Sequence, residues 1–254
     1  MRLQDRVAVV TGGGSGLGAA AVREFVRRGA RVLVLDRNGE AASEVASAAG
    51  DAAVGVECDV TDPGSVDAAL DRAESLGPIA ALVHCAGRGG PVRLLDRDGK
   101  PGSLEDYTDI VRVNLIGTFN TLRLTAARMA ATEPVDGERG VAVLTASVAA
   151  YEGQIGQAGY ASSKAGIVGL TLVAARDLAA KLIRVCSIAP GIFDTPMLAR
   201  VPAEARERLG TSIPHPSRLG RPEEFAELAA HIVANPMLNG ETIRLDGALR
   251  MGPR

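Results

Sequence analysis

A serine, a tyrosine and a lysine in the middle of the chain have the spacing of an acid–base set. Tyr160 and Lys164 are four residues apart, and Ser147 precedes the tyrosine by thirteen residues. Four residues make about one helical turn, so the phenol and the ammonium share one helix face. A free tyrosine has a pKa of about 10, and a cation one turn away favours the phenolate and lowers that pKa. The pattern predicts a group that takes a proton from an alcohol or returns one to a ketone.

Ser147 ends an apolar run, residues 141–147, that is typical of a buried strand. A hydroxyl at a strand end can hydrogen-bond the reacting oxygen and stabilise charge on it. On its own, a tyrosine and a lysine with this spacing more often form a surface pair on a helix, with the serine as a helix cap. The remaining motifs of the chain decide between these two interpretations.

A glycine-rich segment follows the first apolar run and precedes a predicted helix. Glycines let the backbone turn tightly and approach a pyrophosphate, while a helix N-terminus offers free N–H groups and a favourable dipole to that anion. The spacing is G-x-x-x-G-x-G rather than the more general G-x-G-x-x-G. The residues predicted to bind a dinucleotide here are Gly12, Ser15, Gly16, Leu17 and Gly18.

An acidic residue ends the second apolar run. Asp36 lies twenty residues after Gly16. A carboxylate at this place can accept hydrogen bonds from both ribose hydroxyls of adenosine, and it repels a 2′-phosphate. The sequence therefore predicts NAD as the cofactor. NADP stays the alternative, because the next residue, Arg37, could pair with a phosphate.

The segments that must position these residues alternate along the whole chain. Apolar runs, mostly continuous as in strands covered on both faces, are residues 7–11, 31–36, 53–60, 79–86, 141–147, 183–190 and 241–246. Ala-rich segments with helical charge spacing include residues 17–28, 66–76, 104–131, 160–180 and 222–234. The alternation predicts an α/β fold, a Rossmann-type doubly wound parallel sheet of about seven strands with helices on both faces. Because no linker, repeat or low-complexity segment divides residues 1–254, we expect a single domain.

Two stretches interrupt this alternation. Residues 87–102 are rich in Gly, Pro and charge and read as an exposed loop, whereas residues 191–222 hold five prolines around a short helical patch. The second stretch follows the sixth apolar run, where open α/β sheets bind ligands, so it is a candidate substrate lid. Its arginines could attract phosphates of coenzyme A, although a solvated helix face is the commoner role for such residues; they are Arg200, Arg206 and Arg208.

Composition excludes several classes of function. A net charge of -2 and an aromatic content of 3% without Trp argue against a nucleic-acid-binding surface. Cys58, Cys85 and Cys186 form no C-x-x-C pair and lie in apolar runs, which favours buried reduced thiols and no metal site. No apolar run approaches the roughly 20 residues of a membrane span, and no signal peptide is visible. We therefore expect a cytoplasmic protein that acts on a small molecule.

With these motifs in this order, the chain resembles the short-chain dehydrogenase/reductase family. The resemblance implies that Asn114 supports a proton-relay water beside the catalytic Ser147, Tyr160 and Lys164. It implies further cofactor contacts, with Tyr160 and Lys164, from Asp59, Val60, Ala86, Gly87, Pro190, Gly191, Ile192 and Thr195. The chain departs from the family at His84, which stands where an asparagine steadies the central strand and is expected to substitute for it structurally.

A narrower resemblance, to type II 3-hydroxyacyl-CoA dehydrogenases, covers residues 145–157, 216–220 and 235–251. It implies that Gln157 lies near the substrate, together with Ser147 and Tyr160, and that the protein is a homotetramer. The resulting hypothesis is NAD-dependent oxidation of a secondary alcohol, (3S)-3-hydroxyacyl-CoA to 3-oxoacyl-CoA. The alternatives are a 3-oxoacyl-carrier-protein reductase, a hydroxysteroid dehydrogenase and a non-catalytic NAD-binding sensor.

Overall fold

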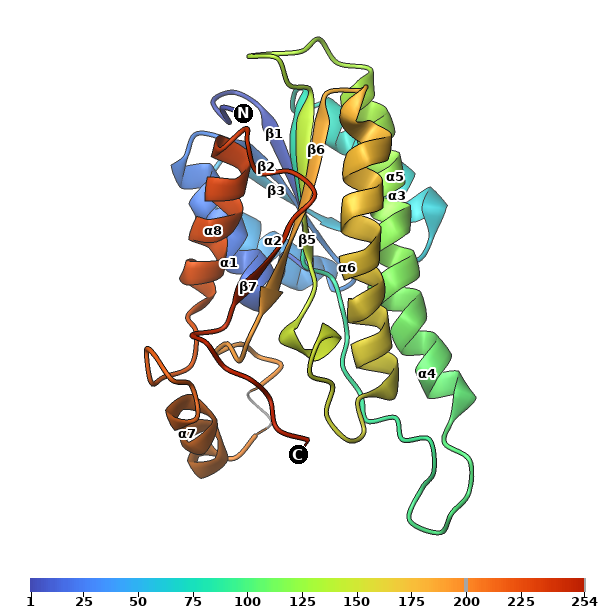
Figure 1. Ribbon diagram of the computed structural model, residues 1–254. Coiled ribbons are helices and arrows are strands. Elements are labelled where there is room, and N and C mark those ends of the chain that lie inside the picture. The colour runs from blue at the N-terminus through green and yellow to red at the C-terminus, as the bar shows by residue number, and fades with distance from the viewer. Residues whose placement is uncertain (199–200, 254) are drawn as a thin grey trace.

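Seven parallel strands form one sheet through the middle of the computed structural model, which describes residues 1–198 and 201–253 (Figure 1). The strands are β1 (Val7–Thr11), β2 (Arg31–Asp36), β3 (Ala53–Glu57), β4 (Ile79–His84), β5 (Gly140–Thr145), β6 (Ile183–Pro190) and β7 (Thr242–Leu245). They lie in the order β3-β2-β1-β4-β5-β6-β7, and each neighbouring pair is parallel. The predicted doubly wound sheet is confirmed.

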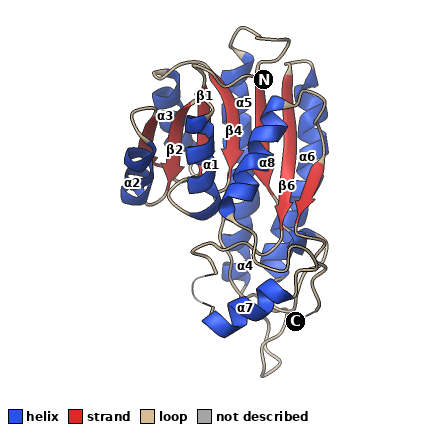
Figure 2. Cartoon of the chain, turned by 90° about the vertical axis from the view of Figure 1, so that its left-hand side faces the viewer, coloured by secondary structure: helices blue, strands red, loops and turns tan. Residues whose placement is uncertain are grey.

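Helices cover both faces of this sheet. They are α1 (Gly16–Arg27), α2 (Gly39–Ala49), α3 (Pro63–Glu74), α4 (Leu104–Val111), α5 (Gly117–Ala130), α6 (Ala158–Ala179), α7 (Ala203–Thr211) and α8 (Pro222–Ala234). Helices α1, α2 and α8 pack on one face, and α3, α5 and α6 on the other. Figure 2 shows the strands side by side with α1 and α8 in front of them.

Two short helical turns have consequences for the site. The helical segment predicted over residues 104–131 is confirmed as far as residue 130, but a π-helical turn, η1 (Arg112–Ile116), interrupts it between α4 and α5. A 3-10 turn, η2 (Val148–Ala150), follows β5. In the η1 turn the extra residue per turn redirects a side chain, and π-turns of this kind are frequent at functional sites.

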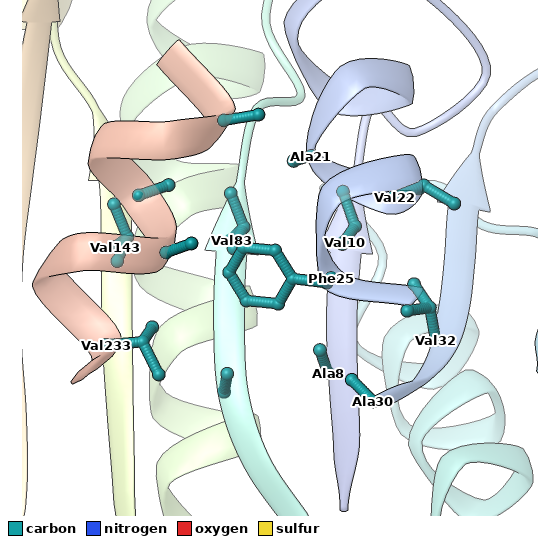
Figure 3. Close-up of a cluster of buried hydrophobic side chains, with 14 of the residues drawn as sticks. Ala8, Val10, Ala21, Val22, Phe25, Ala30, Val32, Val83, Val143 and Val233 are labelled. Atoms are coloured by element: carbon teal, nitrogen blue, oxygen red, sulfur yellow. The ribbon is translucent and has the colours of Figure 1, made fainter. Parts of the chain in front are cut away.

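The strands are apolar on both faces because both faces are buried. In β1, Ala8 and Val10 point toward α1 and α8, whereas Val7 and Val9 point toward the opposite layer. Phe25 of α1 is fully buried and fills the space between the sheet and helices α1 and α8 (Figure 3). Burying such a ring contributes roughly 1.5–3 kcal/mol. The two helix layers therefore hold the strands from both sides and fix the position of their carboxyl ends.

Several predicted strands end earlier in the structure than in the sequence pattern. Strands β3, β4 and β5 stop at Glu57, His84 and Thr145, before the predicted limits 60, 86 and 147. The apolar residues beyond each end lie in the loops that leave the carboxyl edge of the sheet. Candidate site residues, Ser147 among them, thus stand just outside the strands, where open α/β sheets bind ligands.

The same edge carries the two stretches that interrupt the alternation. Residues 191–222, with α7, and residues 87–102 extend beyond the carboxyl ends of the strands (Figure 1). The predicted helical patch, residues 203–208, is confirmed as part of α7. Cys58, Cys85 and Cys186 are free thiols, as predicted. Among the described residues, no helix is both long and apolar enough to cross a membrane.

Candidate active site

Strand β5 and helix α6 bring the acid–base set together at the carboxyl edge. Ser147 follows β5 and opens η2, with its Oγ accepting a hydrogen bond from the Ala149 amide at 3.1 Å. Tyr160 and Lys164 lie in the first two turns of α6, and the Lys164 Nζ is 5.8 Å from the centre of the Tyr160 ring. The Ser147 hydroxyl lies close enough to the Tyr160 phenol to influence its pKa. The predicted juxtaposition of the three side chains is therefore present.

Burial dominates the ionisation of this set. Loss of solvent lowers the pKa of Lys164 to about 8, and its Nζ donates a hydrogen bond to the Thr145 carbonyl at 2.7 Å. Loss of solvent also raises the pKa of Tyr160, and the nearby Ser147 hydroxyl opposes that rise only in part. The expected lowering of the tyrosine pKa by the lysine is therefore wrong for this arrangement. Desolvation of the phenolate outweighs the attraction of an ammonium several ångströms away.

The π-turn η1 places Asn114 behind the set. Its side chain is fully buried, with Oδ1 accepting from the Arg88 amide at 2.8 Å. Its Nδ2 donates to the Arg88 carbonyl at 3.0 Å and to Ser163 Oγ at 3.1 Å. A Cβ on Gly87 would lie 3.2 Å from Asn114 Oδ1 and 3.6 Å from Lys164 Nζ. Asn114, Lys164 and Gly87 thus form one polar cluster beneath the tyrosine.

The glycine-rich segment forms a tight cradle between β1 and α1. Gly12 and Gly16 have positive φ angles of 62° and 51°, which glycine adopts without strain. A Cβ on Gly12 would lie 2.7 Å from the Ala86 amide nitrogen, and a Cβ on Gly18 only 2.1 Å from the Gly12 carbonyl oxygen. Ser15 is the N-cap of α1, and Leu17 is half-buried beside it. A cradle with this shape and a free helix N-terminus fits a pyrophosphate.

Asp36 is held at the end of β2 beside this cradle. Its Oδ2 accepts from the Gly14 amide at 3.1 Å, and its Oδ1 accepts from the Asn38 amide at 3.0 Å. A Cβ on Gly14 would come within 3.0 Å of the carboxylate. The carboxylate is thus fixed where the sequence analysis expects the adenosine ribose. The residues present fit a nicotinamide dinucleotide cofactor.

Asp59 and Val60 follow β3 on the same side of the sheet. Burial raises the pKa of Asp59, but hydrogen bonds from the Thr61 amide and hydroxyl, each 2.8 Å long, bring it below its ordinary value. The Val60 carbonyl accepts from Asn120 Nδ2 at 2.9 Å, and its side chain packs against Gly117. Both residues are therefore rigid, as an adenine contact requires.

The start of the predicted lid lies across from the glycine cradle. Pro190 ends β6, the Gly191 amide donates to the Leu245 carbonyl at 2.9 Å, and Ile192 accepts from the Gly220 amide at 2.9 Å. A Cβ on Gly16 would lie 3.4 Å from the Thr195 Cβ. Thr195 of the 191–222 stretch and Gly16 of the glycine cradle thus face one another.

Gln157 is the N-cap of α6, one helical turn before Tyr160. It forms a parallel bridge with Val92 of the 87–102 stretch. Its side chain is tied to Gln154, with Nε2 donating to Gln154 Oε1 at 3.3 Å. The substrate contact expected of Gln157 stays a prediction.

His84 lies buried beneath the site, at the end of β4. Its Nδ1 is 3.0 Å from Thr11 Oγ1, and the Thr11 hydroxyl also accepts from the Ala86 amide at 3.2 Å. Burial, helped by the charge of Lys164, lowers the pKa of His84 to about 3, so the imidazole is neutral near neutral pH. His84 thus links β1 to β4, as a structural substitute for asparagine would.

The lid arginines differ from one another. Arg206 Nη1 lies 4.0 Å from Asp194 Oδ1, and Arg208 lies on the exposed part of α7. Arg200 lies outside the described residues. Within residues 1–198 and 201–253, no group of three or more metal-ligating side chains comes together.

Sequence reasoning did not identify the last segment of the chain as part of the site. Residues 246–253 run beside residues 151–157, with the Ile155 amide donating to the Pro253 carbonyl at 3.0 Å. Arg244 of β7 binds Glu152 with both terminal nitrogens, at 2.7 and 2.8 Å. No local pattern marks the pair of Arg244 and Glu152, because the two residues lie 92 positions apart in the sequence.

Comparisons with known proteins agree with this geometry. The family model described as "short chain dehydrogenase" matches residues 6–206. The "3-hydroxyacyl-CoA dehydrogenase type-2" of Drosophila melanogaster is 48% identical over 254 residues, 99% of this chain and 100% of that protein. The crystal structure of the enzyme of the same name from Mycobacterium avium has a TM-score of 0.95 at 45% identity, and the match covers 98% of this chain and 97% of that one. A 3-oxoacyl-(acyl-carrier-protein) reductase from Thermotoga maritima is 32% identical over 257 residues, 98% of this chain and 99% of that protein.

Proposed function

The chain belongs to the short-chain dehydrogenase family and is an oxidoreductase, and on that premise we propose that it oxidises (3S)-3-hydroxyacyl-CoA to 3-oxoacyl-CoA with NAD. The observation that carries the proposal is the gathering of Ser147, Tyr160, Lys164 and Asn114 at the carboxyl edge of the sheet, the edge that also carries the glycine cradle. The names of the most similar relatives support the substrate class.

In the proposed reaction, the Ser147 hydroxyl donates a hydrogen bond to the substrate oxygen and orients it against Tyr160. The Tyr160 oxygen accepts the hydroxyl proton as the alcohol becomes a ketone. The nicotinamide cofactor supplies the redox chemistry when it is bound, because it accepts the hydride from the carbinol carbon. In the reverse direction the Tyr160 hydroxyl returns its proton to the 3-oxo group, and its raised pKa suits that role.

Lys164 and Asn114 are proposed to assist the proton transfer at Tyr160 rather than the chemistry at the carbinol carbon. The buried Lys164 Nζ, with a pKa of about 8, sits between the Thr145 carbonyl and the tyrosine ring. It stabilises the negative charge of the phenolate oxygen before that oxygen takes up the alcohol proton. Asn114 is hydrogen-bonded to the Arg88 backbone. It would provide the next polar atoms, after Lys164, on the path of the proton from the tyrosine to solvent.

NAD rather than NADP is proposed on the strength of Asp36. Its carboxylate is anchored by two backbone amides and cannot turn away from a ribose hydroxyl without losing both hydrogen bonds. A 2′-phosphate placed there would meet this negative charge at close range, which is a repulsive element against the wrong cofactor.

The lid residues are proposed to cover an aliphatic substrate. Residues 191–222 would shield the reacting atoms from water, which strengthens every electrostatic contact within the site. Residues 87–102 extend from the opposite side of the same edge (Figure 1). The arrangement suits a long thioester chain better than a compact alcohol.

A homotetramer and a cytoplasmic location stay predictions. An exposed apolar groove of about 490 Å³ between α5 and α6 supports self-association, because monomers rarely leave such surfaces uncovered. Its main exposed side chains are Ile116, Phe119 and Val173. Sedimentation analysis at several concentrations would test the oligomeric state, and a monomer at every concentration would refute it.

The substrate proposal is tested by steady-state kinetics on three alcohols under identical conditions with NAD. We expect kcat/KM to be highest for a (3S)-3-hydroxyacyl-CoA, lower for the corresponding carrier-protein ester and lowest for a hydroxysteroid. Activity should change gradually with acyl length, because one methylene alters binding by only about 1–3 kcal/mol. A clear preference for the carrier-protein ester or the steroid would refute the substrate class and leave the dehydrogenase chemistry in place.

A further inference from the structure

The segment between Ser147 and Tyr160 is held from both sides by distant parts of the chain. Residues 151–157, called here the substrate loop, receive a hydrogen bond from the Val92 amide to the Gly156 carbonyl at 2.7 Å. On the other side lie residues 246–253, called here the C-terminal segment. In this segment the Pro253 carbonyl accepts a hydrogen bond from the Ile155 amide at 3.0 Å, and the Gly252 carbonyl accepts one from Gln154 Nε2 at 3.2 Å. The substrate loop is thus the middle one of three adjacent segments.

A chain of side-chain hydrogen bonds leads from the C-terminal segment to Gln157. Gln154 donates its Nε2 to the Gly252 carbonyl and accepts from Gln157 Nε2 at 3.3 Å through its Oε1. The backbone amide of Gln154 in turn donates a hydrogen bond to Gln157 Oε1 at 3.1 Å. Both polar ends of the Gln157 side chain are therefore fixed by Gln154, whose own orientation is fixed by Gly252.

Arg244 fastens the start of the loop. Its guanidinium pairs with both oxygens of Glu152, at 2.7 and 2.8 Å, and its Nε donates to Asp246 Oδ2 at 2.7 Å. Its cation lies 5.1 Å from the centre of the Tyr151 ring. Arg244 is only 21% exposed, and hydrogen bonding to it lowers the pKa of Glu152. A two-point Arg–carboxylate pair fixes orientation as well as distance.

We propose that the C-terminal segment is a wall of the substrate site and that Arg244 and Gln154 are positioning residues that set Gln157 against the alcohol substrate. This inference rests on the proposed function only for the side of the site that receives the alcohol. The cofactor cradle is held by other contacts, namely those of Gly14 and Asn38 with Asp36 and of Gly13 with Leu35. Loosening the substrate loop should therefore affect the alcohol and spare NAD.

The first test compares Michaelis constants in variants with a matched control. Gln154→Leu removes the side-chain hydrogen bonds to Gln157 and Gly252 and leaves the one from the backbone amide of residue 154. KM for the alcohol should then rise roughly threefold to tenfold, the effect of about one hydrogen bond. In Arg244→Met the rise should be larger, and Arg244→Lys should recover part of it, because the charge remains but the two-point contact does not. In each variant KM for NAD should stay within about twofold of wild type, the scatter of substitutions away from a binding site.

Arg128→Met supplies the control. Arg128 of α5 has three ionic partners in α3, namely Asp67, Asp71 and Glu74, against two for Arg244, and it lies away from the site. The Arg128→Met variant should have a lower Tm than wild type and an unchanged KM for both NAD and the alcohol. If Gln154→Leu and Arg244→Met changed only Tm, as the control does, or raised the KM of NAD and of the alcohol together, the inference would be overturned.

The second test needs no turnover and no cofactor. Amide hydrogen exchange of residues 151–157 should be faster in Gln154→Leu and Arg244→Met than in wild type, while exchange in α6 beyond Lys164 is unchanged. Unchanged exchange in the loop would also refute the inference. If the wild-type protein prefers an alcohol other than the CoA ester, the proposed substrate fails, but the same KM comparison with the preferred alcohol still decides this inference.

Discussion

The two halves of the site are held together in different ways. The cofactor half is built from backbone: a Cβ on Gly18 would lie 2.1 Å from the Gly12 carbonyl oxygen, and Asp36 is fixed by two backbone amides. The proposed substrate half is held by side-chain pairs, such as Arg244 with Glu152 and Gln154 with Gln157. A backbone cradle leaves no room for variation, whereas side-chain pairs can be exchanged one at a time. We expect the first half to fix the cofactor and the second to tune the substrate.

The largest effect should come from the residue where the halves meet. Tyr160→Phe keeps the buried ring and removes the oxygen that moves the proton, so kcat should fall by about 10²–10⁴. The Kd for NAD should remain nearly unchanged, because the glycine cradle and Asp36 are intact. Stopped-flow turnover and NAD titration measure the two quantities. Retention of more than about a tenth of wild-type kcat would rule out Tyr160 as the acid–base group.

The cofactor half should fail abruptly when a single methyl group is added. Gly18→Ala places a Cβ against the Gly12 carbonyl, so we expect a loss of NAD affinity of at least about tenfold, together with a lower Tm. Gly64→Ala is the matched control, since a Cβ there meets nothing closer than 3.5 Å. Calorimetric titration with NAD compares the two variants. Equal affinities would show that the cradle does not bind the cofactor.

Asp36 should control the choice of cofactor rather than the overall rate. In Asp36→Ala the ratio of kcat/KM for NAD to that for NADP should fall by about tenfold or more, since about 1.4 kcal/mol of repulsion is removed for each factor of ten. Arg37→Ala should keep the preference for NAD. A wild-type protein that used both cofactors equally would contradict this part of the account.

The smallest effect is expected from pH. Burial raises the pKa of Tyr160, so the phenol keeps its proton near neutral pH and the base form appears only as pH rises. kcat for alcohol oxidation should therefore increase at least several-fold from about pH 7 to about pH 9, whereas kcat for ketone reduction should change little, because the phenol stays protonated over this range. Initial rates in both directions give the two profiles. An oxidation rate that falls across this range would reverse the assignment.

The comparison of the two halves also explains what the sequence could predict. Gly12, Gly16 and the pair Tyr160 and Lys164 have local spacing that reports their geometry, because tight turns need glycine and one helical turn is four residues. The contact of Arg244 with Glu152 spans 92 residues and has no local signature. The pKa of Tyr160 was predicted in the wrong direction, because burial depends on packing from several elements and not on the lysine one turn away.

The position of Asn114 shows an intermediate case. The family resemblance could predict a role for Asn114. It could not predict the π-turn that directs the Asn114 side chain toward the Arg88 backbone, because the sequence pattern there is that of one continuous helix. A π-turn arises from tertiary contacts at its own position, and helix periodicity alone does not reveal it.

The central claim, NAD-linked oxidation of a (3S)-3-hydroxyacyl-CoA, is tested most directly by following the hydrogen that leaves the substrate. The measurement uses (3S)-3-hydroxybutyryl-CoA with deuterium at C3, and the (3R) isomer as its control. Our account predicts that the deuterium appears in NADH, that 3-oxobutyryl-CoA forms in equal amount and that the (3R) isomer is left unchanged. NADH without deuterium, or equal oxidation of both isomers, would contradict it.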